Sequence, residues 1–242
     1  MQRDPPDIPL IHLLPNVLTI IAICAGLTAI RFGYQGSYET AVRLILLACI
    51  LDGLDGRLAR LLQCESSVGA ELDSLADFLN FGVAPALIIY SWGLADLPSA
   101  GWIAVVAFTI CCVLRLARFN VSAKSEETPD SDYFIGIPSP AAALLVMLPM
   151  LISFTFSDLP LVHPVIIAAY MILIGILMIS HLRIYSFKGL RVSRSNAKYT
   201  LLGIVLLTAA LLTYLWATMV VMCLAYLVSV IWAVLHHDTA KD

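Results

Sequence analysis

The sequence predicts an all-α fold, a polytopic transmembrane bundle of about eight helices. Of the 242 residues, 60% are hydrophobic and only 13% are charged, and the mean hydropathy is +0.92. A chain of this composition has too little polar surface to cover a water-soluble core. Long apolar stretches also recur along the chain, each separated from the next by glycine, proline or charged residues. Composition and spacing together predict a membrane protein.

Each apolar stretch is close to the ~20 residues that a helix needs to cross a ~30 Å hydrocarbon layer. The stretches predict one transmembrane domain, 14–236, between a cytoplasmic N-terminal segment, 1–13, and a cytoplasmic tail, 237–242. The expected helices, in order, are 14–32, 39–62, 68–91, 100–120, 139–157, 161–180, 198–214 and 218–236.

The basic residues predict how these helices are oriented. All but two of the 14 Lys and Arg residues lie in the segments 57–60, 115–124 and 183–198 or near the termini. Since Lys and Arg concentrate on the cytoplasmic side of membranes, we expect both termini to be cytoplasmic, in the inner membrane of a prokaryote. The exceptions, Arg31 and Arg43, could reach the interface, or Arg43 could pair with Glu39.

Four aspartates lie inside two consecutive apolar stretches: Asp52 and Asp55 in the second, Asp73 and Asp77 in the third. A charged residue at the centre of a membrane helix costs about 2.5–3.5 kcal/mol on insertion scales. The nearby Arg60 cannot neutralise four acids, so a purely structural ion-pair network is disfavoured. The sequence therefore predicts that bound cations compensate these carboxylates.

The spacing of the acids predicts which helix faces carry them. Positions 52, 55, 56, 59 and 60 follow one face of a helix, and positions 69, 73, 77 and 80 follow one face of the next. Two polar faces can therefore meet within the membrane.

Oxygen ligands favour hard divalent cations, and paired metal ions are a recurring device for phosphoryl displacement. Four carboxylates balance two Mg²⁺ or Mn²⁺ ions, so we expect an intramembrane dimetal site. Arg60 offers a planar fork for a phosphate group. Intramembrane acids also mark ion paths, so a divalent cation transporter is the alternative class. It is disfavoured because no second copy of the acidic pair occurs, as an internal repeat would supply.

These residues carry a resemblance to a known family. The pattern Asp52-x-x-Asp55-Gly56-x-x-Ala59-Arg60, followed after eight residues by Gly69-x-x-x-Asp73-x-x-x-Asp77, resembles the signature of the CDP-alcohol phosphotransferases. The resemblance implies that CMP leaves a CDP-linked donor as an alcohol attacks the donor's distal phosphorus. It implies metal ligation by Asp52, Asp55, Asp73 and Asp77, a base role for Asp77, and CDP binding by Gly56, Ala59, Arg60 and Gly69.

Three further stretches resemble those of small, multi-spanning phosphatidylserine synthases within this family: 15–19 (PNVLT), 114–120 (LRLARFN) and 134–140 (FIGIPSP). CDP-diacylglycerol and L-serine are then the expected substrates, and Asn16 and Thr19 could reach the nucleotide. A zwitterionic acceptor needs a cation for its carboxylate and an acceptor for its ammonium group. Arg118, Asn120 and Ser139 are the candidates.

Several alternatives stay open. Arg115 and Arg118 also suit a helix end that topology alone would make basic, and Asn16 could instead cap the first helix. The acceptor could be glycerol phosphate, choline or an inositol derivative. The basic residues from Arg183 to Lys198 are expected to orient the chain and contact anionic lipids. The family implies a homodimer in contact with membrane lipids, and no nucleic acid is expected as a partner.

Overall fold

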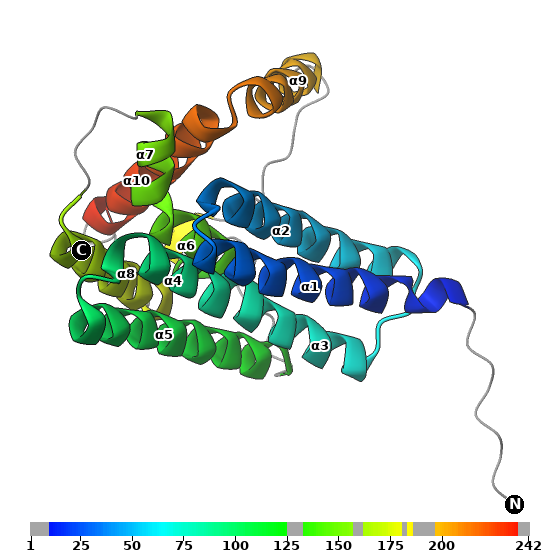
Figure 1. The fold of residues 1–242 in the computed structure, drawn as a ribbon. Helices are drawn as coiled ribbons and strands as arrows, with labels where there is room; N and C mark the ends of the chain where they lie inside the picture. The colour runs from blue at the N-terminus through cyan, green and yellow to red at the C-terminus, as the bar shows by residue number, and fades with distance from the viewer. Residues whose placement is uncertain (1–9, 125–132, 157–161, 181–182, 186–196, 237–242) are drawn as a thin grey trace, which may run out of the picture. The chain divides into compact units, whose positions relative to one another are not determined.

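The computed structural model describes residues 10–124, 133–156, 162–180, 183–185 and 197–236 (Figure 1). Both expected terminal segments lie wholly or largely outside these residues, as does most of the basic stretch that ends at Lys198. The chain divides into two compact units, Met1–Trp92 and Gly93–Asp242.

The first unit is built on an antiparallel helix pair. A short 3-10 turn, Leu10–Leu13, leads into α1 (Leu14–Tyr34), which packs extensively along α2 (Tyr38–Leu61). Ala22, Ala25 and Ala48 are buried where the two helices meet. Small side chains of this kind let membrane helices approach closely. At the start of α2, Arg43 pairs with Glu39 at 3.0 Å, so one of the two expected arrangements is confirmed.

The third expected helix changes its winding along its length. It consists of α3 (Ser67–Asp77), a π-helical segment η2 (Phe78–Val83), α4 (Ala84–Ile89) and a second π-helical segment η3 (Tyr90–Leu94). Pro85 is the second residue after η2, and proline has no N–H for the carbonyl group four residues earlier, which lies within η2. The wider π turn accommodates that loss.

Helix α1 packs against this composite helix through glycines. A Cβ atom on Gly26 would collide with the side chain of Asn80, and one on Gly33 would lie 3.0 Å from Cγ1 of Ile88. Both glycines therefore bring α1 close to η2 and α4.

The second unit contains α5 (Pro98–Lys124), α6 (Ser139–Val146), α7 (Leu148–Thr155), α8 (Pro164–Ile179), α9 (Ala197–Thr213) and α10 (Leu215–His236). Helix α5 packs along α8, where a Cβ on Gly175 would lie 3.3 Å from Cα of Phe108. Two strands that we did not expect, β1 (Tyr133–Ile135) and β2 (Arg183–Tyr185), pair antiparallel with Phe134 opposite Ile184.

The expected helix 139–157 is broken at Met147, between α6 and α7. Pro149 explains the break, because it cannot donate a hydrogen bond to the carbonyl group of Leu145. That carbonyl instead accepts a hydrogen bond from the hydroxyl group of Tyr170, at 2.9 Å. A contact from α8 thus replaces the bond that the proline removes.

Helices occupy every range where the sequence predicts one, but not all of them qualify as membrane spans. Within the described residues, four helical stretches are long and apolar enough to cross a membrane: Ile11–Tyr34, Ser67–Leu94, Pro98–Ser122 and Leu215–Trp232. Pro164–Ile179 and Lys198–Thr213 are apolar but shorter. The helical membrane-protein fold is therefore supported, and the count of eight spans stays a prediction.

Candidate active site

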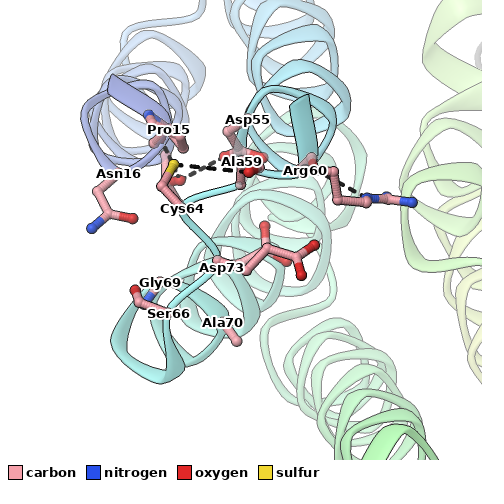
Figure 2. A pocket seen from close by; sticks show the side chains of 13 residues that line it. Pro15, Asn16, Asp55, Ala59, Arg60, Cys64, Ser66, Gly69, Ala70 and Asp73 are labelled. Atoms are coloured by element: carbon pink, nitrogen blue, oxygen red, sulfur yellow. Dashed lines mark hydrogen bonds between the residues drawn. The ribbon is translucent and has the colours of Figure 1, made fainter. Parts of the chain in front are cut away.

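A cavity of about 330 Å³ opens in the first unit, where the beginning of α1, the end of α2 and the beginning of α3 come together (Figure 2). The link from α2 to α3 turns sharply at Gln63, whose φ is +51°. This turn brings the two halves of the acidic pattern together. The cavity is lined by Pro15, Asn16, Thr19, Asp55, Gly56, Ala59, Arg60, Cys64, Glu65, Ser66, Gly69, Ala70 and Asp73.

The cavity gathers most of the residues that the sequence singles out. All six expected to bind CDP line it, although three different helices supply them: Asn16, Thr19, Gly56, Ala59, Arg60 and Gly69. Two of the four expected metal ligands, Asp55 and Asp73, also line it. Asp52 lies one turn before Asp55 on α2, and Asp77 lies one turn after Asp73 on α3. Neither of them lines the cavity.

The beginning of α3 is held in place by a side-chain cap. Ser66 Oγ accepts a hydrogen bond from the backbone N–H of Gly69 at 3.0 Å, which satisfies one of the free donors at the helix start. A Cβ on Gly69 would lie only 3.0 Å from Oδ1 of Asn16. The small residue at position 69 therefore lets α3 approach the amide group of Asn16 on α1.

The end of α2 leaves room at the cavity wall. A Cβ on Gly56 would meet no atom within 4 Å. Arg60 is exposed, and its Nε donates a 3.2 Å hydrogen bond to the carbonyl oxygen of Gly56. In Figure 2 the guanidinium group extends away from α1. A bulky anionic ligand can therefore approach the backbone of α2 beside a cation.

The carboxylates are close enough to interact with one another. The side chains of Asp52 and Asp77 lie close enough to interact, and Asp52 is repelled by the charge of Asp55. Asp73 is repelled by both Asp52 and Asp55. Like charges this close repel one another, so a cation bound between these carboxylates would relieve the repulsion.

Asp55 is the most buried of the four, with 3% of its surface exposed. Its Oδ2 accepts a 2.6 Å hydrogen bond from the hydroxyl group of Thr19. Its Oδ1 is buried without a hydrogen-bond partner in the part of the chain that the structure describes. An orphaned buried carboxylate oxygen is costly and suits a metal ligand.

This donor set of aspartate oxygens fits hard divalent cations. Among the described residues, however, no three His, Cys, Asp or Glu side chains converge as tightly as a single ion requires. The dimetal site therefore stays a prediction.

The expected acceptor residues lie in the second unit. Arg118 is exposed, and its Nη1 donates a 3.1 Å hydrogen bond to the carbonyl oxygen of Ile179. Ser139 is fully buried and accepts a 2.7 Å hydrogen bond from Nη1 of Arg115. Asn120 is half-buried at the end of α5. Arg115, which the sequence predicts only as a basic residue at a helix end, thus contacts one of the candidate acceptor residues. One signal was available, since Arg115 precedes Arg118 by one helical turn in the stretch 114–120.

Comparisons with known proteins agree with this site. The profile of the CDP-alcohol phosphatidyltransferase family matches residues 12–177, which is more than half of the chain and includes the whole cavity. The chain belongs to this family.

Similar curated proteins are named CDP-diacylglycerol–serine O-phosphatidyltransferase. The protein from Mycobacterium leprae is 48% identical over 139 residues, which are 57% of this chain and 46% of the relative. The protein from Helicobacter pylori is 39% identical over 75% of each chain. The protein from Bacillus subtilis is 34% identical over 73% of this chain and 92% of the relative. The chain therefore spans about half the length of the mycobacterial relatives.

Proposed function

We propose that the protein is a CDP-diacylglycerol–serine O-phosphatidyltransferase, which makes phosphatidylserine and CMP from CDP-diacylglycerol and L-serine. The observation that carries the proposal is the cavity of the first unit. It brings the six expected CDP-binding residues together with Asp55 and Asp73. The names of the relatives from M. leprae, H. pylori and B. subtilis supply the substrates.

The reaction is one displacement at phosphorus. The hydroxyl oxygen of serine attacks the phosphorus that bears diacylglycerol, and the bond from that phosphorus to the CMP oxygen breaks. The proton of the serine hydroxyl goes to the carboxylate of Asp77, and the electron pair of the broken bond leaves with CMP. Asp77 suits the base role because it ends α3 beside Asp52, on the same helix face as Asp73.

The chain's own residues bind and orient the donor. Gly56 and Gly69 keep side chains away from the walls of the cavity, so that the CDP group can lie against α2 and α3. Arg60 places a cation beside the diphosphate, while Asn16 offers an amide for the nucleotide. Thr19 acts by holding Asp55 in position.

Asp52, Asp55, Asp73 and Asp77 would hold two Mg²⁺ or Mn²⁺ ions. When bound, such ions stabilise the negative charge that develops on the attacking and leaving oxygens. Arg118, Asn120 and Ser139 would form the serine pocket, and Arg115 would support it, since its Nη1 donates a hydrogen bond to Ser139. The protein would act as a homodimer in a prokaryotic inner membrane, with both termini in the cytoplasm.

The most informative experiment measures the lipid product. Purified protein with CDP-diacylglycerol and Mg²⁺ or Mn²⁺ is given serine, glycerol phosphate, choline or an inositol derivative, and both CMP and lipid are quantified. Phosphatidylserine from serine alone is the expected result. Another product would identify a sibling transferase of the same family. Uptake of labelled Mn²⁺ into vesicles without CMP release would point to the transporter and overturn the proposal.

A further inference from the structure

A second cavity, of about 360 Å³, lies in the second unit between α6 and α10. Its volume is within the ~300–1,000 Å³ of small-molecule sites. The wall consists mainly of hydrocarbon and sulfur groups, such as those of Leu144, Leu145, Met219 and Met222. Methionine side chains adapt their shape to flexible apolar ligands. A cavity with such a lining favours an apolar occupant over water.

Two hydroxyl groups interrupt this apolar wall, those of Tyr226 and Ser229, and Oγ of Ser229 donates a 2.7 Å hydrogen bond to the backbone carbonyl of Tyr226. The hydroxyl oxygen of Tyr226 is buried and has no hydrogen-bond partner among the described residues. A buried phenol normally finds a partner, because leaving it unpaired costs free energy. Tyr226 also interacts electrostatically with Arg115. The unpaired hydroxyl group of Tyr226 is therefore suited to a hydrogen-bond acceptor on the occupant.

The cavity is too small to enclose a protein helix. A span of 18 residues is about 27 Å long and 10 Å wide, so it would need on the order of 2,000 Å³. The cavity nevertheless opens outward, because Ala225 and Met222 on its rim are exposed. Since α10 contains a candidate membrane span, Leu215–Trp232, bilayer lipids are the apolar molecules that reach this rim.

We propose that this cavity binds an ester-linked acyl chain of a membrane phospholipid. The chain lies along Leu144, Met219 and Met222, and the ester carbonyl oxygen accepts a hydrogen bond from the hydroxyl group of Tyr226. An acyl ester unites the two properties that the cavity requires, an apolar body and an acceptor near one end. This proposal can be tested independently of the proposed transfer reaction, because the measurement is lipid binding.

The first test maps where a lipid binds. The full-length protein is placed in nanodiscs that contain phosphatidylcholine with a photoreactive diazirine in one ester-linked acyl chain. After irradiation, labelled peptides are identified by mass spectrometry. We expect labelling to concentrate on residues 139–146 and 215–229. Ala225→Leu fills the rim and should lower this labelling at least about fivefold, whereas the control Ala209→Leu, at an exposed position of α9, should not.

The second test isolates the hydroxyl group. The native protein should prefer the ester lipid over its ether analogue by about fivefold, which is what one ordinary hydrogen bond supplies. Tyr226→Phe should bind both lipids equally, and Tyr214→Phe, at an exposed position, should keep the preference. Uniform labelling of all helices, labelling that Ala225→Leu leaves unchanged, or an ester preference that survives Tyr226→Phe would each overturn the proposal.

Discussion

The hydroxyl group of Thr19 donates a 2.6 Å hydrogen bond to Oδ2 of Asp55 and so joins α1 to α2 at the wall of the candidate active site. The same hydroxyl oxygen lies 3.1 Å from the carbonyl oxygen of Pro15. Both Thr19 and Asp55 are buried. A residue that the sequence assigns to the nucleotide therefore also positions an expected metal ligand.

Replacing Thr19 by valine should destabilise the protein. The variant keeps the shape of the side chain but leaves Oδ2 of Asp55 without its donor, which costs about 1–3 kcal/mol. Thr19→Ser should keep the bond and most of the stability. The control is Thr28→Val, since Thr28 is a half-buried threonine on the same helix whose hydroxyl group donates a hydrogen bond to the backbone carbonyl of Cys24 within that helix. Thermal unfolding in detergent measures the effect, and equal losses in Thr19→Val and Thr28→Val would contradict it.

Replacing Gly56 by alanine should weaken donor binding without harming the fold. A Cβ at position 56 meets no protein atom within 4 Å, but it projects where the CDP group would lie. Gly53→Ala is a matched control, because Gly53 is equally open on the same helix and does not line the cavity. Both changes should slightly stabilise α2, by about 0.5–1 kcal/mol. Titration with CDP-diacylglycerol should show weaker binding for Gly56→Ala alone.

Replacing Asp77 by asparagine should abolish turnover while sparing much of the donor affinity. The amide cannot accept the proton of the acceptor hydroxyl, so a loss of about 10²–10⁴-fold in kcat is expected. CMP release measures turnover, and binding of CDP-diacylglycerol is measured separately. Asp96→Asn, at an exposed position outside the site, should behave like the native protein. Near-normal activity of Asp77→Asn would show that another group takes the proton.

Divalent cations should stabilise the folded protein. Mg²⁺ or Mn²⁺ relieves the repulsion among the four carboxylates, and a ligand at a hundred times its Kd adds about 2.7 kcal/mol. The melting temperature should therefore rise with either ion and stay unchanged with KCl of equal ionic strength. Asp55→Asn and Asp73→Asn should each reduce the rise, whereas Asp96→Asn should not. An equal response of all three variants would argue against metal binding at these carboxylates.

The contact of Gly26 with Asn80 should show strong coupling. Gly26→Ala forces a Cβ against the amide group of Asn80 and should destabilise the protein by about 1–3 kcal/mol. Asn80→Ala removes that amide, whose oxygen and nitrogen are buried without hydrogen-bond partners among the described residues. The double variant should therefore be more stable than the sum of the two single changes predicts, as a double-mutant cycle by thermal unfolding would measure.

The positions of the helices were predictable because the length of an apolar stretch is local information. The range 39–62 agrees with α2 (Tyr38–Leu61), and 198–214 agrees with α9 (Ala197–Thr213). The break at Met147 was not predicted, although Pro149 stands in the middle of the apolar stretch. Proline is tolerated in many membrane helices, so only the contact of Tyr170 with the Leu145 carbonyl shows that the chain breaks here.

The composition of the candidate site was predictable to a similar degree. The spacing of Asp55, Gly56 and Asp73 placed them on facing helix surfaces, and one cavity contains all three. The hydrogen bond between Thr19 and Asp55 could not be predicted from the sequence, because it depends on how α1 and α2 align. The pairing of Arg115 with Ser139 was missed for the same reason, since it depends on where α5 meets α6.

The π-helical segment Phe78–Val83 lies between the part of the helix that carries the aspartates and the part, α4, that packs against α1. An extra residue in a turn rotates everything beyond it about the helix axis. The apolar face of α4 is therefore offset about the helix axis from the position that a regular α-helix continuing from Asp77 would give it. The helix can consequently pack α4 and present its aspartates on sides that a regular α-helix of the same sequence would not combine.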